Sequence, residues 1–475
     1  MTKTLRLEKS HLISVLLERI DALTLRLDQA EREIETLKAE NSELKSRLSS
    51  NSRNSSKPPS SDGYTKKPAL PKKLKGKHGG QIGHKGNTLQ QSQKPDQTVI
   101  CKPDRCMCGH TFSEQEMELS EKRQVFDLPQ PKLEVTEYQI YKGICPDCGL
   151  SHKGLAPAGV NSPTQYGNKV KALVVLLNVQ YKVPFKKIQL LFGDLFSCPI
   201  NESSVYSAAL LCYHNLDQSE QIIKSQVTQN DVVHVDETGV RVEGLLRWLH
   251  TASTNLFTYL FVHDKRGEQA LQSDKSILNN FTGWLIHDCW SSYFKFTRAK
   301  HGLCGAHILR ELEALVETGQ SKWAKTFKTF LMHVYEMPFQ QRVMQQQQII
   351  SRYKRICQSG LRAEPPPIKA LGKRGRSKRT KARNLVERLI REQDAVLSFA
   401  FNKEVPFTNN LAERDIRPVK VKQKISNCFR SFKGAEIFAR IEGFVSTSRK
   451  QKQNVFSELC HTFDGYNFVT EGVAK

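Results

Sequence analysis

The sequence contains no uninterrupted apolar run long enough to cross a membrane. Its first residues carry charges at Arg6, Glu8 and Lys9 in place of an apolar signal core, which predicts a cytoplasmic protein with no membrane partner. In that compartment the twelve cysteines are expected to be thiols or metal ligands, and not disulfides. Acidic residues are scarce beside basic ones, since 48 Asp and Glu face 72 Lys and Arg, a net charge of +24. This excess favours a polyanionic partner, and nucleic acid is the first candidate.

At 475 residues the chain is too long for one ordinary core, so we expect a multidomain α+β protein. The predicted order is a coiled-coil helix over 1–48, a basic flexible linker over 49–95, a small cysteine-containing domain over 96–158, a helical region over 160–228, a mixed α/β core in two parts over 229–318 and 401–475, and a helical basic insertion over 319–400 between those parts.

Apolar residues fall into heptads between Ile13 and Leu48. One seam position holds mostly β-branched residues and the other mostly leucines, which favours a parallel dimer. Asn41 falls on the first position, where a buried amide fixes the register, and Glu33 with Lys38 is one of the opposite-sign pairs expected across the interface. The alternative is a single amphipathic helix packed on a globular core.

A Ser-, Pro- and Gly-rich stretch with many lysines follows the heptads and has no apolar period. It predicts a cationic arm that tracks phosphates, or equally a solvated spacer.

Two cysteine pairs follow the linker. Cys145 and Cys148 lie in CPDCG, a turn that directs two thiolates at one cation, and Cys106 with Cys108 supplies the other pair for tetrahedral zinc. The first pair has a one-residue spacer, so Cys101 or His110 could replace one of its members. The alternating run LEVTEYQIY (133–141) predicts a strand, so a structural zinc would stabilise a small β-rich domain. The competing interpretation is inert buried cysteines.

Three short helices are predicted between 165 and 229, with the break CPIN before the last. Their spacing resembles a helix-turn-helix, with Lys186 and Lys187 available for DNA, although three helices of a packing subdomain would give the same pattern.

Two apolar strands lead into aspartates. NDVVHVDETG predicts a strand that ends at Asp236 and breaks at Thr238 and Gly239, which would place the carboxylate at the rim of a sheet. GWLIHDCW leads in the same way into Asp288. Between them LLRWLHTAS and LFTYLFVH predict two further strands of a meander, so the two aspartates are expected on neighbouring strands.

A third carboxylate, Glu413, opens a basic amphipathic helix after Asn409 and Asn410. Three carboxylates suit a pair of Mg²⁺ ions, which activate a nucleophile and stabilise the leaving oxygen of a phosphodiester. Asp415 is a rival ligand that ranks second because it points off the Glu413 face of a helix. The order strand-Asp, strand-Asp, helix-Glu resembles the Asp-Asp-Glu recombinases built on a ribonuclease H-like fold.

The insertion carries a basic loop, GKRGRSKRTKAR, with no acids. Its cations, among them Lys373, Arg374 and Arg376, are expected to meet phosphates.

Five segments of the sequence resemble a known family more specifically: SRNSSKPPSSDGY, GGQIGHKG, HDCWSSYF, CGAHILREL and NNLAERDIRPVKVKQKIS. They resemble, in the same order, bacterial transposases of insertion sequence family sixty-six. The resemblance implies that Asp236, Asp288 and Glu413 ligate two Mg²⁺ ions for cleavage of element ends and transfer of the 3′ hydroxyl to target DNA. Cys304 and His307 belong to a shared block, for which we expect packing more than metal binding.

The expected partners are double-stranded DNA at element ends and target, a second copy through the coiled coil or a higher oligomer, and companion proteins encoded by the element. Phosphate contacts are expected from the cations on or beside the Glu413 helix, namely Arg414, Arg417, Lys420 and Lys422. Two alternatives remain: a metal-dependent nuclease that cuts without joining, and a non-catalytic zinc DNA-binding protein.

Overall fold

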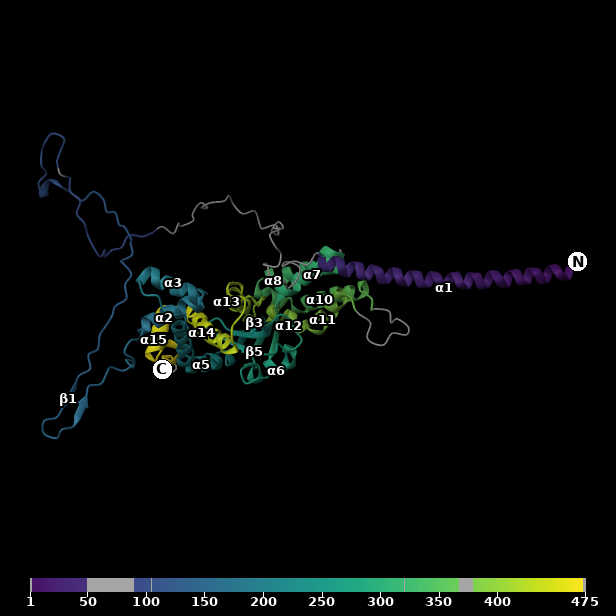
Figure 1. Cartoon of the computed structure of the whole chain (residues 1–475). Coiled ribbons are helices and arrows are strands. Elements are labelled where there is room, and N and C mark those ends of the chain that lie inside the picture. The colour runs from purple at the N-terminus through teal and green to yellow at the C-terminus, as the bar shows by residue number, and fades with distance from the viewer. Residues whose placement is uncertain (1, 49–88, 104, 320, 367–378, 473–475) are drawn as a thin grey trace. The chain divides into compact units, whose positions relative to one another are not determined.

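The computed structural model describes residues 2–48, 89–103, 105–319, 321–366 and 379–472. These residues belong to two compact units, which are described separately. One unit comprises Met1–Tyr64, Ala158–Leu190 and Ile200–Lys475, and the other comprises Thr65–Pro157 and Leu191–Pro199. The larger unit contains helices around a mixed sheet, so the chain is an α+β protein as predicted (Figure 1). None of the helices within the described ranges is long and apolar enough to span a bilayer.

Helix α1 (Thr2–Leu48) is continuous, as the heptads predict. Its apolar seam side chains are exposed within the single chain, with Leu23 at 58% and Leu27 at 60%. An exposed apolar stripe, interrupted at Asn41, is what a helix that pairs with another would show before pairing. The dimer stays a prediction. The linker segments SRNSSKPPSSDGY and GGQIGHKG fall within 49–88 and lie outside the described residues.

The sheet has the order β5-β4-β3-β6-β7. An antiparallel meander forms one side, and two strands parallel to β3 form the other. The strands are β3 (Val232–Val242), β4 (Leu245–Ser253), β5 (Thr258–His263), β6 (Trp284–His287) and β7 (Lys300–Leu303).

Strand β3 does not break at Thr238 and Gly239, so that prediction is wrong. It continues because β4 pairs along its whole length, up to Val242↔Leu245. The connection is a two-residue turn in which Glu243 (φ 53°) and Gly244 (φ 77°) both have positive φ, the geometry of tight hairpins. Gly239 serves close packing, since a Cβ there would lie 2.9 Å from Cδ1 of Leu246.

The predicted helices before the sheet are present. They are α2 (Asn168–Val175), which continues as a π-helical turn η3 (Leu176–Gln180), then α3 (Phe185–Phe196), α4 (Glu202–Asn215) and α5 (Asp217–Thr228). The side chain of Asn201 caps α4 by accepting a hydrogen bond from the N–H of Ser203. Helices α2 and α4 pack against α15, and α4 and α5 pack against α14, so these three helices are part of the larger unit's core.

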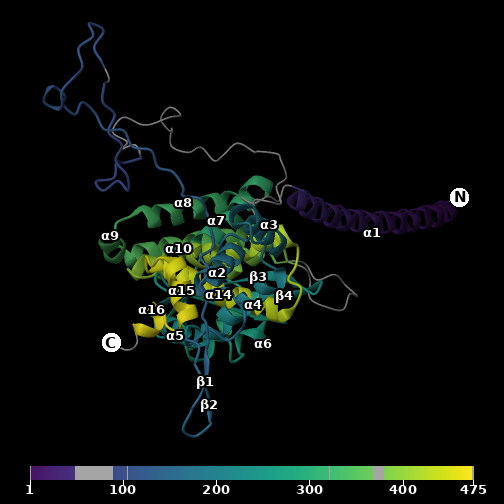
Figure 2. The ribbon, with the colours of Figure 1, turned by 60° about the vertical axis from the view of Figure 1, so that its left-hand side comes forward.

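The insertion is helical, as predicted. Its helices, with the one that leads into it, are α7 (Gly305–Gly319), α8 (Lys322–Glu336), α9 (Phe339–Met344), α10 (Gln346–Ala363), α11 (Lys381–Arg391) and α12 (Gln393–Phe401). Helices α7, α8 and α10 lie side by side (Figure 2) around buried Trp323, Phe327 and Tyr353. The Tyr353 hydroxyl donates to the Leu389 carbonyl at 2.6 Å, which satisfies a polar group inside this core.

The chain returns to the sheet after the insertion. The last helices are α13 (Asn410–Ser426), α14 (Phe432–Lys450), α15 (Val455–Asp464) and α16 (Phe468–Glu471). Helix α13 packs against β3 and β4, α14 against β5 and α12 against β7. Short elements complete the larger unit: α6 (Glu268–Leu271), η4 (Leu278–Asn280) and η5 (Tyr293–Lys295).

The smaller unit has little regular structure within its described residues. They contain η2 (Glu114–Glu116) and an antiparallel pair, β1 (Lys142–Ile144) and β2 (Ser151–Lys153). The strand predicted over 133–141 is absent there, so the prediction of a β-rich domain is wrong for the described part. Val135 is 91% exposed and Tyr141 77%, so the alternating pattern has no core face to pack on.

Candidate active site

Asp236 and Asp288 lie at the same end of the parallel pair β3 and β6. Asp236 follows His234, the last β3 residue that pairs with β6, and Asp288 directly follows His287, the last residue of β6. Burial raises the pKa of the Asp236 carboxyl well above its ordinary value. The charges of Glu237, Asp288 and, more weakly, Glu413 act in the same direction. Asp236 therefore lies where other carboxylates repel its own charge.

The turn after β6 holds Asp288 in a strained backbone. Cys289 has a φ of 73°, which is rare for a residue with a side chain. Two hydrogen bonds stabilise it: Trp290 N–H donates to Asp288 Oδ1 at 3.0 Å, and Cys289 N–H donates to His287 Nδ1 at 3.2 Å. Nε2 of His287 lies 3.1 Å from Nδ1 of His301, and burial lowers the pKa of His287 well below its ordinary value. A neutral histidine pair thus supports this turn.

Glu413 lies in the first turn of α13, and Asn409 fixes that turn to the sheet. Asn409 is the N-cap residue and is 1% exposed, but its side chain makes no cap bond. Its Oδ1 instead accepts from His234 Nδ1 at 2.9 Å, and its Nδ2 donates to the Val235 carbonyl at 2.8 Å. Asn409 thus attaches the start of α13 to β3 through these side-chain bonds, and not by capping the helix.

The N-terminus of α7 reaches Glu413 from the other side. Gly305 N–H donates to the Phe407 carbonyl at 2.8 Å, and a Cβ on Gly305 would lie 2.2 Å from the Phe407 ring, so only glycine allows this approach. As a result Asn409 N–H donates to Cys304 Sγ at 3.2 Å. His307 Nδ1 lies 3.6 Å from Glu413 Oε1.

Cys304, His307 and Glu413 offer ligand atoms that all lie within 4.8 Å of one another. Among the residues that the structure describes, this is the one such group of three or more His, Cys, Asp and Glu side chains. Arg310 closes the other side, with a guanidinium nitrogen 3.9 Å from Glu413 Oε2. Sequence reasoning singled out Cys304 and His307 but favoured packing for them, and it did not single out Arg310.

Glu237 is a fourth carboxylate, which sequence reasoning missed. Its side chain is 1% exposed, and Arg266 donates to Oε1 through Nε at 2.9 Å and a second nitrogen at 2.7 Å. Tyr293 donates to its other oxygen. Arg266 in turn stacks on Trp248 and Trp290, at 5.0 and 4.4 Å from the ring centroids. Because both oxygens are already bonded, Glu237 serves to position its neighbours. Only its adjacency to Asp236 could have pointed to it.

Asp415 is engaged elsewhere. Its Oδ2 accepts from Lys450 Nζ at 2.5 Å and from the Thr258 hydroxyl at 3.1 Å, and the aspartate is 7% exposed. Two residues are about half a helical turn, so Asp415 points away from the Glu413 face and toward Thr258 of β5 and Lys450 of α14, as expected.

The predicted DNA-contacting cations differ in their exposure. Arg414, Arg417 and Lys420 on α13 are exposed, as are Lys186 and Lys187 on α3. Lys420 Nζ donates to the Gly239 carbonyl at 2.8 Å, which holds it beside the sheet. Lys422 is half-buried, and burial, with the nearby charge of Lys182, lowers its pKa to about 8.

The basic loop of the insertion is described only in part. Lys373, Arg374 and Arg376 lie outside the described residues. Arg379 and Arg383 both form ion pairs with Glu387, so one acid outside the loop pairs with two cations at this end of it.

The two cysteine turns share one backbone pattern. Cys106 N–H donates to the His110 carbonyl and Cys145 N–H to the Leu150 carbonyl, each at 2.9 Å. Glycines at positive φ close the turns, with Gly109 at 93° and Gly149 at 70°. The first turn is one residue shorter, as its sequence requires.

The two cysteines of each turn also interact with each other. The backbone N–H and thiol of Cys108 lower the pKa of Cys106, and Cys148 acts likewise on Cys145. Cys101 and His110 are exposed, and His110 Nε2 lies 3.3 Å from Glu116.

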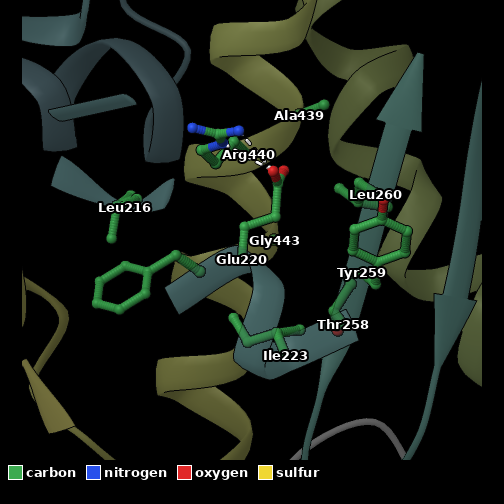
Figure 3. Close-up of a pocket in the computed structure, with 10 residues that line it drawn as sticks. Leu216, Glu220, Ile223, Thr258, Tyr259, Leu260, Ala439, Arg440 and Gly443 are labelled. Carbon is green, nitrogen blue, oxygen red and sulfur yellow. Dashed lines mark hydrogen bonds and ion pairs between the residues drawn. The ribbon is translucent and has the colours of Figure 1, made fainter. Parts of the chain in front are cut away.

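A cavity between α5, β5 and α14 lies away from these residues (Figure 3). Arg440 crosses it to Glu220 at 2.6 Å, and apolar side chains such as Ile223 and Leu260 line the rest. None of the predicted site residues that the structure describes lines it.

Comparison with protein families gives two matches. Residues 163–437 match the family described as Transposase IS66 family, and residues 6–90 match a family of unknown function (DUF6444). A search of curated proteins found no match. The first match covers β3, β6 and α13 with the three carboxylates.

Proposed function

The chain belongs to the IS66 transposase family, whose model spans more than half of its 475 residues, and from this premise we propose that it cleaves the ends of a mobile DNA element and joins them to target DNA. We assign catalysis to Asp236, Asp288 and Glu413. The observation that supports this most is geometric: the parallel pairing of β3 with β6 puts Asp236 and Asp288 at the same end of that pair, and the bonds of Asn409 to His234 and Val235 attach the start of the Glu413 helix beside Asp236. The charges of Asp288 and Glu413, which both raise the pKa of Asp236, agree with this proximity.

The donor set fits a pair of Mg²⁺ ions. Magnesium prefers carboxylate oxygens, and cations would remove the repulsion that acts on Asp236. Oε1 of Glu413 is buried without a hydrogen-bond partner, so it can accept a ligand bond without breaking an existing one. When bound, two such ions lower the pKa of water and stabilise the leaving oxygen of a phosphodiester.

The chain's own residues bind and orient DNA in this proposal. Asn409 holds Glu413 against β3, while the strained turn at Cys289 holds Asp288. Arg414 and Arg417, exposed on α13, would bind phosphates flanking the cleaved bond, as would Lys420. The freed 3′ hydroxyl would then attack target DNA in line, with no covalent protein intermediate.

The sheet supports a ribonuclease H-like core. The antiparallel meander β3-β4-β5 followed by parallel β6 and β7 is the strand order expected from that resemblance. We further propose that α1 forms a parallel dimer that pairs two element ends, and that the helical region over 160–228 contacts DNA through Lys186 and Lys187, which are exposed on α3. Sedimentation of a chain lacking 1–48 tests the dimer, because an unchanged oligomer would contradict it.

We also propose a structural zinc held by Cys106, Cys108, Cys145 and Cys148. The shared backbone pattern of the two turns supports it, because such turns direct two thiolates at one cation. Companion proteins of the element remain an expectation of the family resemblance.

Strand-transfer assays with end-bearing DNA and Mg²⁺ test the function. Joined products are expected. Cleavage without joining would favour the nuclease alternative, and DNA binding without cleavage would favour a non-catalytic DNA-binding protein.

A further inference from the structure

The cluster of Cys304, His307 and Glu413 does not have the chemistry of a magnesium site. Sulfur and imidazole nitrogen are ligands of borderline and soft cations, of which Zn²⁺ is the most common in proteins. Three protein ligands and one open position is the usual arrangement of non-structural zinc. The cluster also includes a residue assigned to the Mg²⁺-dependent reaction, so its occupation would affect that reaction.

The geometry of the cluster is close to that of a zinc site. Two ligands at about 2.1 Å from one tetrahedral ion lie roughly 3.4 Å apart. His307 Nδ1 and Glu413 Oε1 are 3.6 Å apart, and all three ligand atoms lie within 4.8 Å of one another. Only small side-chain shifts separate this arrangement from coordination.

Two of the three ligand atoms have unmet bonding capacity. His307 Nδ1 and Glu413 Oε1 are both buried and have no hydrogen-bond partner, although they face each other. A buried polar atom without a partner is destabilising, and a shared cation would satisfy both atoms together.

We propose that Cys304, His307 and Glu413 form a Zn²⁺ site, and that zinc bound there withdraws Glu413 from the Mg²⁺-dependent site and inhibits cleavage. The second part rests on the proposed function; the first does not. Binding would release the Cys304 thiol proton to solvent and form one bond each to sulfur, nitrogen and oxygen.

Arg310 opposes zinc in the structure as it stands. One of its nitrogens lies 3.3 Å from His307 Nε2 and another lies 3.9 Å from Glu413 Oε2. The positive charge of Arg310 is therefore close enough to repel a cation bound by the cluster. Its side chain is 30% exposed and can move to solvent. Removal of this charge should therefore strengthen zinc binding, an effect that a purely structural role for the cluster does not produce.

The test counts zinc in the full chain without DNA. Wild type is expected to retain one equivalent more than Cys304→Ser, and His307→Gln should bind this equivalent at least about tenfold more weakly. Cys428→Ser, a half-buried cysteine outside the cluster, should match wild type. Arg310→Met should bind the extra zinc more tightly than wild type. Circular dichroism identifies any variant that fails to fold. If Cys304→Ser does not fold, the zinc affinities of His307→Gln and Arg310→Met decide whether the site exists. Equal zinc in wild type, Cys304→Ser and His307→Gln would overturn the site.

Inhibition is measured as the ratio of Mg²⁺-dependent cleavage with and without zinc, for each variant. This ratio should fall more in wild type than in His307→Gln, and most in Arg310→Met. Equal ratios in the three proteins, or stimulation by zinc, would overturn the regulatory part. Absence of any cleavage with Mg²⁺ alone would contradict the proposed function while the zinc count still decides the site.

Discussion

The side-chain amide of Asn409 joins the start of α13 to the first half of β3, because its Oδ1 accepts a hydrogen bond from His234 Nδ1 at 2.9 Å. The same amide donates to the Val235 carbonyl at 2.8 Å. Asp236 is the next residue on β3, and Glu413 lies one helical turn beyond Asn409. This amide therefore sets the position of one carboxylate relative to the other.

Asn409→Ala should lower the free energy of unfolding by about 3 kcal/mol, because it leaves the His234 N–H and the Val235 carbonyl buried without partners. DNA cleavage should fall further than DNA binding, since Glu413 loses its attachment to β3. Denaturant unfolding, cleavage rate and gel-shift affinity measure the three effects. Asn410→Ala is the matched control: Asn410 is exposed, and its change should cost less than about 0.5 kcal/mol. Equal effects from the two substitutions would contradict the role of Asn409.

Asp415→Asn should destabilise the fold while leaving the catalytic step largely intact. The substitution leaves the Lys450 ammonium, whose side chain is 9% exposed, without its counter-charge, and breaking a buried pair in this way costs about 3–5 kcal/mol. The double change Asp415→Leu with Lys450→Met should cost less than the single one. Thermal unfolding of the three proteins, with cleavage assayed below their transitions, checks this. A stable Asp415→Asn that has lost cleavage would show that Asp415 acts in catalysis.

Acid should destabilise the protein partly through His250. Burial lowers the pKa of this histidine to about 4 from 6.5, and it stacks on Phe261 at 4.8 Å. Since the unfolded chain takes up the proton first, the stability contribution is present above pH 6.5 and is lost as the pH falls toward 4, about 3 kcal/mol in all.

His250→Phe should remove this contribution and reduce the slope of unfolding free energy against pH, near pH 5, by about 1.4 kcal/mol per pH unit. His263→Phe is the control, because that histidine is partly exposed. An unchanged slope in His250→Phe would contradict the assignment.

Cys145→Ser should release one zinc from the full chain, because loss of one thiolate opens a tetrahedral site. Metal analysis after dialysis measures the loss, and Cys198→Ser is the control, since Cys198 lies outside both turns. Cys101→Ser and His110→Gln then decide whether either residue replaces Cys106 or Cys108. Freshly purified protein that retains no zinc would rule out the structural site.

The sequence predicted local elements well where periodicity decides them. The helix over α1, the helices before the sheet, the meander and the helix that carries Glu413 all follow from apolar spacing. The prediction of a strand over 133–141 was wrong because alternating apolar and polar residues do not by themselves provide a partner strand. The break at Gly239 was wrong because the hairpin at Glu243 and Gly244 extends β3 past its glycine.

Contacts between distant residues could not be predicted in this way. The ion pair of Asp415 with Lys450, the bonds from Arg266 to Glu237 and the approach of His307 to Glu413 join segments whose spacing in the chain carries no signal. Family resemblance singled out CGAHILREL, but only the packing of Gly305 on Phe407 explains why this block lies beside Glu413.

The most direct test of the account is the effect of Asp236→Asn, Asp288→Asn and Glu413→Gln on end cleavage with Mg²⁺, beside gel-shift affinity for the same DNA. Each change removes a charge and little volume, so each should lower the cleavage rate by about a thousandfold, roughly 4 kcal/mol, while affinity holds because Lys and Arg supply it. Cleavage that survives in Glu413→Gln, or affinity that falls in parallel with cleavage in all three, would contradict the assignment of these carboxylates to catalysis.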